Sequence, residues 1–165
     1  MKMKKLLTVK VTNRFFAKAE AEGWADHAIS LVDPGVQCDI PGVNQHIEFF
    51  EDLEDPSSKA PTREHIERAL AFSSNFLDGQ NILVHCEGGI CRSTAMAILI
   101  HCQAGFSPEE ALKRVERVRP QLWPNRLIIS HGDDILGLNG ELVEVVRHFR
   151  DTNANKIFIG GELEE

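Results

Sequence analysis

The chain has 165 residues, enough for one domain with a single core and too few for two ordinary domains. Its apolar fraction of 42% and charged fraction of 26% are those of a soluble globular protein. The formal net charge of −7 argues against an extended nucleic-acid-binding surface, and an anionic substrate would need a local positive site.

Targeting and redox signals are absent from the sequence. After the charged start at Met1 to Lys5, no apolar run reaches the length of a signal peptide or a membrane-spanning helix. The four cysteines, at positions 38, 86, 91 and 102, have neither the spacing of a secreted disulfide framework nor that of a zinc site. We therefore expect a cytoplasmic protein that binds no membrane and no metal.

Strands and helices alternate along the chain. Leu6 to Val11 alternates apolar and polar residues and predicts a strand, after which Asn13 caps a helix that Gly23 ends. Asp33-Pro34-Gly35 stops the second strand, and the segment from Gly35 to Asn44 predicts a loop. This second strand is predicted over 28–32, and further strands are predicted over 46–50 and 82–84.

Helical signals dominate the second half of the chain. Pro61-Thr62 opens a helix that Asp78-Gly79 closes, and Ser107-Pro108-Glu109-Glu110 forms a capping box at the start of another. The capping box begins the helix predicted over 109–118. Other helices are predicted from Arg92 and over 127–136 and 141–149. This order predicts an α/β fold with a mainly parallel central sheet of about four or five strands, flanked by helices on both faces. We expect one domain over 1–150 and an acidic, poorly fixed tail over 151–165.

The run His85-Cys86-Glu87-Gly88-Gly89-Ile90-Cys91-Arg92-Ser93 is the main functional signal. It lies between a predicted buried strand and an apolar helix, so its loop N–H groups and the helix N-terminus favour a bound anion. The same dipoles favour Cys86 as a thiolate. The planar fork of Arg92 fits two oxygens of a phosphate-like dianion. The segment therefore predicts phosphoryl transfer through a phosphocysteine.

This segment resembles the signature of the cysteine-dependent phosphatases: His-Cys, any five residues, Arg, then Ser or Thr. It is most similar to the compact dual-specificity branch of the protein tyrosine phosphatases, and the similarity extends from about Ile29 to Phe149. The resemblance implies Cys86 as nucleophile and Arg92 as phosphate ligand. It also implies a phosphate-binding loop formed by Glu87, Gly88, Gly89, Ile90, Cys91 and Arg92.

The general acid is expected in the acidic segment from Glu51 to Asp55. In the compact phosphatases an aspartate protonates the leaving group from a loop between a strand and the helix that precedes the signature. Asp52 follows the third predicted strand and an aromatic pair, as in that family pattern. Asp55 is the alternative, because Pro56 would stiffen its loop. Asp52 is favoured.

Three other residues are candidates for supporting roles. Ser93 is interpreted as a hydroxyl donor to the Cys86 thiolate, although a plain helix cap explains its position nearly as well. His85 is expected to position the loop through backbone contacts. Asn125 matches a position of the dual-specificity branch, and it either braces the signature loop or caps a helix.

Cys91 departs from the dual-specificity pattern, which commonly has a small or hydroxylated residue before the arginine. Ile90-Cys91-Arg92-Ser93 instead resembles the low-molecular-weight tyrosine phosphatases and arsenate reductases, in which a second cysteine resolves an oxidised nucleophile. The signature lies mid-chain here, which is the dual-specificity order. A redox role for Cys91 and a packing role both stay open.

These observations predict a metal-free, cofactor-free phosphoric monoester hydrolase that acts on a phosphorylated protein or peptide. The loop has no lysine, and Glu87 beside the nucleophile disfavours a polyphosphate head group. The alternatives are an arsenate reductase or sulfur-transfer enzyme that uses the same thiolate, and a phosphate-binding pseudophosphatase. The sequence leaves open whether the enzyme prefers phosphotyrosine or phosphoserine/threonine, and it leaves the oligomeric state open.

Overall fold

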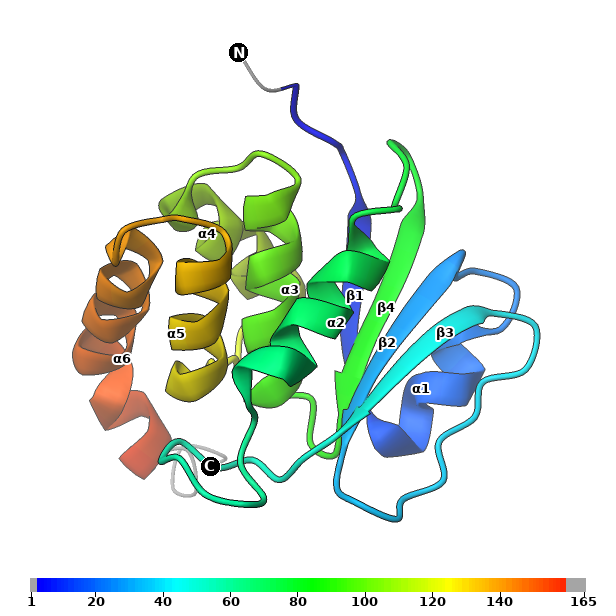
Figure 1. The fold of residues 1–165 in the computed structure, drawn as a ribbon, viewed down its shortest axis with the longest axis horizontal. Helices are drawn as coiled ribbons and strands as arrows, with labels where there is room; N and C mark the ends of the chain where they lie inside the picture. Colours follow the sequence, from blue (N-terminus) through cyan, green and yellow to red (C-terminus); the bar gives the residue numbers. More distant parts are fainter. Residues whose placement is uncertain (1–2, 160–165) are drawn as a thin grey trace.

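The computed structural model describes residues 3–159. Its centre is a four-stranded, all-parallel sheet, in the order β1-β4-β2-β3 (Figure 1). Parallel strands need crossover connections, which the helices between them supply. The predicted α/β fold is confirmed, and the strands are β1 (Thr8–Asn13), β2 (His27–Val32), β3 (Asn44–Phe49) and β4 (Asn81–Cys86).

The strand that precedes the signature is central. β4 pairs with β1 on one side and with β2 on the other. Its last residue, Cys86, lies opposite Asn13, and His85 lies opposite both Thr12 and Ser30. In an open parallel sheet, ligands bind beyond the carboxyl ends of the strands. The topology therefore places Cys86 at the edge where a ligand is expected.

Helices cover both faces of the sheet unequally. One helix packs on one face, and the other five lie on the opposite side, where the two outermost helices pack mainly on other helices (Figure 1). The small face buries Ala17, Ala21, Ala28 and Leu83, together with Ile40 from the loop after β2. The helices are α1 (Arg14–Ala21), α2 (Arg63–Ser73), α3 (Arg92–Gln103), α4 (Pro108–Val118), α5 (Arg126–Ile135) and α6 (Glu141–Ile159).

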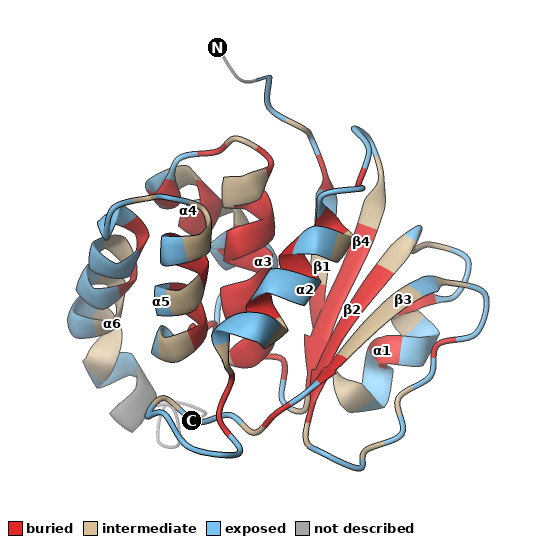
Figure 2. Cartoon of the chain, in the orientation of Figure 1, coloured by how far each residue is buried: buried red, intermediate tan, exposed pale blue. Residues whose placement is uncertain are grey.

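The large face is organised around α3. Every residue from Arg92 to His101 is buried, and α3 runs as a buried rod between the sheet and the outer helices (Figure 2). A helix that is buried all round is expected to be apolar all round, as this one is from Ala95 to Ile100; His101 is a buried polar residue in its last turn. Arg92 and Ser93 are thus held in the first turn of the most enclosed helix of the described part.

Several element boundaries differ from those predicted. α2 ends at Ser73, before the predicted end at Asp78-Gly79, and Ser74 Oγ and Asn75 Nδ2 donate to the Ala71 carbonyl of its last turn. The predicted Asn13 cap of α1 and Ser107 cap of α4 are confirmed, since their side chains accept the N–H groups of Phe16 and Glu110.

The C-terminal helix is longer than predicted. α6 continues past Phe149 to Ile159, so the segment from Asp151, expected to be a tail, begins as helix. Asp151 accepts from Arg147, and Thr152 and Asn153 donate to carbonyls one turn earlier. These polar side chains support the helix from its own surface. The rest of the expected tail, 160–165, lies outside the described residues.

The described part has neither a membrane-spanning helix nor a cluster of metal-binding side chains. None of its helices combines the length and apolar character that crossing a bilayer requires. Within residues 3–159, no group of three or more His, Cys, Asp or Glu side chains is arranged to hold a metal ion.

Candidate active site

Cys86 lies at the base of a loop that curls over its sulfur. The residue is 2% exposed, at the end of β4. Its Sγ accepts the N–H of Gly89 at 3.2 Å and lies 3.1 Å from Oγ of Ser93. Both donors stabilise negative charge on sulfur, and the N-terminus of α3 adds its partial positive charge. The predicted pairing of Cys86 with Ser93 is present in the structure.

The loop is held from outside by Arg119, at the end of α4. Its Nε donates to the Gly89 carbonyl at 2.8 Å and its Nη2 donates to the Gly88 carbonyl at 3.2 Å. Gly89 has φ 69°, and a Cβ there would lie 2.7 Å from the Thr12 carbonyl and from Arg119 Nη2. Carbonyls bound from outside leave loop N–H groups free to face the sulfur, and only glycine fits at position 89.

Arg92 occupies the first position of α3 and is 4% exposed. Its Nη1 donates to Asp33 Oδ1 at 2.7 Å and to the Phe50 carbonyl at 2.6 Å. Within the described part, Nε has no partner, and every recorded hydrogen bond of this guanidinium is made by Nη1. The edge formed by Nε and Nη2 is therefore available to bind two oxygens of one anion.

Asp52 lies beside the signature loop. Its Oδ1 accepts a hydrogen bond from Asn125 Nδ2 at 2.8 Å. Asn125 also donates its backbone N–H to the Cys91 carbonyl at 3.0 Å and caps α5 through Ile128. Asn125 thus combines the two roles that the sequence left open. Asp55 is exposed and has no recorded hydrogen bond or ion pair to any described residue.

Cys91 faces Asp52 and has a strongly perturbed thiol. Burial, followed by the charge and hydrogen bonding of Asp52, raises the pKa of Cys91 to about 12. All four cysteines are free thiols in the structure. A thiol held in its protonated form is a slow nucleophile at neutral pH.

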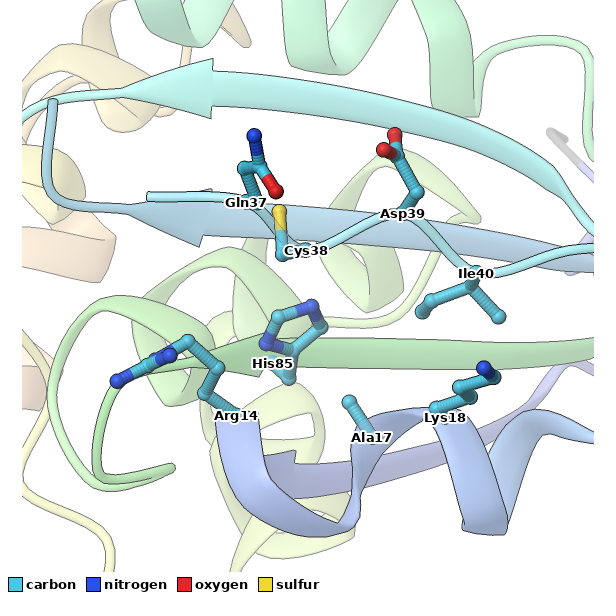
Figure 3. Close-up of a pocket in the computed structure, with 8 residues that line it drawn as sticks. All are labelled: Arg14, Ala17, Lys18, Gln37, Cys38, Asp39, Ile40 and His85. Atoms are coloured by element: carbon cyan, nitrogen blue, oxygen red, sulfur yellow. The ribbon is translucent and has the colours of Figure 1, made fainter. Parts of the chain in front are cut away.

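His85 lies behind the site. Successive strand residues point to opposite faces, and His85 faces α1 in a cavity of about 330 Å³ lined by α1 and residues 37–40 (Figure 3). Its Nδ1 is 3.2 Å from the Cys86 carbonyl, and burial lowers its pKa. A neutral imidazole with its proton on Nδ1 would donate to this carbonyl, and the predicted role of His85 in positioning the loop stays a prediction.

Glu87 is neutralised by α1. Its carboxylate pairs with Arg14 Nε at 2.6 Å, and its carbonyl accepts the Arg14 N–H at 3.2 Å. The repulsion of anions expected from Glu87 is therefore reduced. Ile90, at 38% exposure, is the one exposed large apolar side chain of the described signature loop.

This chain resembles solved phosphatase structures in fold. It has a TM-score of 0.61 to DUSP15 at 19% identity, over 88% of this chain and 94% of that one. Human DUSP28 gives 0.55 at 20% identity, over 79% and 92%. The chain has the dual-specificity phosphatase fold. A mouse putative dual specificity phosphatase complexed with zinc tungstate, with the same fold, gives 0.57 at 20% identity, over 81% and 84%. No family model and no curated protein sequence matches this chain.

Three residues of the site were missed by sequence reasoning. Asp33 was interpreted as a strand terminator, and Arg14 and Arg119 were not singled out. Each is far from the signature in sequence and contacts it only through the fold. One available signal was the position of Asp33 at the carboxyl end of a predicted strand, where a parallel sheet gathers its functional residues.

Proposed function

We propose that this protein is a protein-tyrosine or dual-specificity phosphatase that hydrolyses phosphomonoesters through a phosphocysteine intermediate. The observation that carries the proposal is the juxtaposition of a buried Cys86 sulfur, receiving the Gly89 N–H, with an Arg92 whose Nε is left without a partner in the described part. A tetrahedral dianion seated over the sulfur would complete both sets of contacts.

In the first step, the Cys86 thiolate attacks phosphorus and the bond to the leaving-group oxygen breaks. Arg92 binds two equatorial oxygens, and the Asp52 carboxylic acid gives its proton to the departing oxygen. Such a positioned acid typically contributes about 10²–10⁴-fold. Asp52 is supported over Asp55 because Asn125 ties it to the same loop that holds the nucleophile.

In the second step, the Asp52 carboxylate takes a proton from water, which attacks the phosphocysteine and releases inorganic phosphate. The sulfur leaves as a thiolate. Ser93 Oγ, 3.1 Å from Sγ, donates a hydrogen bond to it, and so does the Gly89 N–H. Both donors are fixed by α3 and its loop, so little reorganisation is needed.

The test is turnover of p-nitrophenyl phosphate by the full chain, with and without EDTA. We expect equal turnover in both, loss of turnover in Cys86→Ser, and tungstate or vanadate binding that persists in that variant. Arg92→Lys is expected to lose both binding and turnover, because a point charge does not replace a bidentate contact. Anion binding without turnover in the unmodified chain would instead indicate a pseudophosphatase.

A phosphorylated protein or peptide is the proposed substrate, in the cytoplasm. The phosphate loop has no lysine that would supply charge to a second phosphate group. This favours a singly phosphorylated group over a polyphosphate. The arsenate-reductase alternative needs a ready second thiol, and the raised pKa of Cys91 disfavours it.

A further inference from the structure

A second basic cavity lies at the opposite end of α3 from the signature loop. It has a volume of about 240 Å³, and its walls come from the start of β1, the last turn of α3 and one face of α4. It is lined by Leu7, Thr8, Val9, His101, Arg114, Arg117 and Val118. The six residues of β4 span about 20 Å from one end of the sheet to the other, at roughly 3.3 Å for each residue. One small ligand therefore cannot occupy both sites.

Unused hydrogen-bonding groups line this cavity. His101 is 3% exposed, and in the described part neither its Nδ1 nor Arg114 Nε has a hydrogen-bond partner. Buried polar groups are normally satisfied, so the unpartnered His101 Nδ1, beside an Arg114 Nε that reaches only a Glu110 oxygen 3.5 Å away, indicates a missing partner. The Arg114 guanidinium lies over the Phe106 ring, 3.9 Å from its centroid, and this cation–π contact restrains it.

The local charge is positive in an otherwise acidic protein. Arg114 Nε and Arg117 Nη1 lie 3.5 and 3.8 Å from the same Glu110 oxygen, so a single carboxylate serves two guanidinium groups. Both distances are longer than a hydrogen bond. The Lys4 ammonium adds a further positive charge, 5.3 Å from the centroid of the Phe106 ring.

We propose that this cavity binds a tetrahedral oxyanion, either free phosphate or the phosphate of a small phosphomonoester. Arg114 and Arg117 would donate to its oxygens, and the His101 imidazole would contribute a further donor. Guanidinium pairs of this kind bind phosphate in forked geometry. Because the cavity lies beyond the far end of α3, the bound anion would not compete with substrate at Cys86.

The test is an NMR titration of the ¹⁵N-labelled full chain with inorganic phosphate. The amides of Gly88 and Gly89 report the signature loop, whereas the amides of Thr8 and Val9 and the Arg114 Nε–H report the second cavity. We expect two sets of shifts with separate dissociation constants. If only the first set responds up to tens of millimolar phosphate, the second site does not exist.

Three variants on α4 test whether this cavity is a specific site. Arg117 is exposed, so Arg117→Gln should fold normally. It is expected to raise the dissociation constant reported by the second set of shifts about tenfold, the cost of one charged hydrogen bond. Glu110→Gln is expected to lower that dissociation constant, because the competing carboxylate is removed. Lys113→Gln removes the same charge from an exposed position outside the cavity and should change neither set. Equal weakening in Arg117→Gln and Lys113→Gln would reduce the site to general surface charge and overturn the proposal.

The source of the anion is resolved by a second titration with phenylphosphonate, which phosphatases do not hydrolyse. Tighter binding than inorganic phosphate identifies an organic phosphate as the ligand, and equal binding identifies free phosphate. Neither result depends on turnover at Cys86, so failure of the proposed enzyme activity and failure of this site are separate outcomes.

Discussion

Arg92 and Asp33 form an ion pair of 2.7 Å between the first turn of α3 and the end of β2. Asp33 is half-exposed, whereas Arg92 is buried. The pair, together with the Phe50 carbonyl, occupies Nη1 and leaves Nε on the opposite edge of the guanidinium without a partner in the described part. Asp33 is therefore a positioning residue for the phosphate ligand.

Removal of this carboxylate should impair catalysis without unfolding the protein. Asp33→Ala is expected to lower kcat/KM for p-nitrophenyl phosphate by roughly ten- to a hundredfold, the value of a charged hydrogen bond. Asp33→Asn retains an acceptor and should lose less. Asp39→Ala, an exposed acid on the same loop, is the control. An unchanged vanadate affinity in Asp33→Ala would show that Arg92 needs no such support.

The acid assignment is tested by dependence on the leaving group. Asp52→Asn should lower turnover of an alkyl phosphate by about 10²-fold or more, and that of an activated aryl phosphate far less, because only the poor leaving group needs a proton. It should also flatten the basic limb of the pH–rate profile. Asp55→Asn is the matched control, and the opposite result would move the acid to position 55.

Two adjacent glycines should respond differently to the same added methyl group. Gly89→Ala is expected to abolish turnover and to lower the free energy of unfolding by about 1–3 kcal/mol, because φ is positive and the Cβ meets the Thr12 carbonyl. Gly88→Ala has open space around its Cβ and should fold and turn over substrate. Thermal denaturation and p-nitrophenyl phosphate assays measure both. Similar losses at the two positions would contradict the close approach at Gly89.

The environment of Cys91 predicts that it captures oxidised Cys86 slowly. With a pKa raised to about 12 by burial and by Asp52, almost none of the thiol is ionised at pH 7. After brief peroxide treatment at that pH, recovery of activity with dithiothreitol should be equal in the parent chain and in Cys91→Ser. Better recovery in the parent would support the redox role that the sequence left open. Cys38→Ser and Cys102→Ser test whether another thiol contributes.

Burial of His101 should make the fold acid-sensitive. Desolvation, and secondarily Arg114, lowers the pKa of His101 to about 4, from an ordinary value of 6.5. Between these values the unfolded chain binds the proton and the folded chain does not, so stability falls as the pH drops from 6.5 toward 4. The loss from this group is about 2 kcal/mol at pH 5. Urea denaturation in phosphate-free buffer should show a smaller pH dependence for His101→Phe than for the parent.

Local sequence signals predicted the elements that carry the nucleophile. The apolar run 82–84, the glycines at 88 and 89 and the apolar helix from Arg92 are all contiguous, so strand, loop and helix could be inferred together. The position of Ser93 beside Cys86 followed from the same segment. Contacts across the fold were not accessible in this way. The residues around Arg119 give no sign that α4 ends beside the signature loop. For Asp33 the sequence indicates only the carboxyl end of a strand, because which strand lies beside β4 depends on strand order.

Boundaries failed where polar residues have a local structural role. Thr152 and Asn153 are typical of a loop, yet in α6 they donate to the carbonyls of the preceding turn. Ser74 and Asn75, just past the end of α2, make the same kind of contact. Whether such a side chain continues a helix or ends it depends on the packing of the neighbouring apolar residues, which the sequence does not show.

The central place of β4 has a consequence for how the chain folds. β1 cannot form its only strand pairing until β4 has been synthesised, and β2 gains its second neighbour at the same moment. Long-range parallel pairings require the closure of large loops, and the entropy lost in that closure precedes the stabilising contacts, which slows folding. The sheet and the nucleophile's loop are thus completed together. A nascent or truncated chain that stops before Asn81 lacks β4, exposes unpaired strand edges and is expected to aggregate.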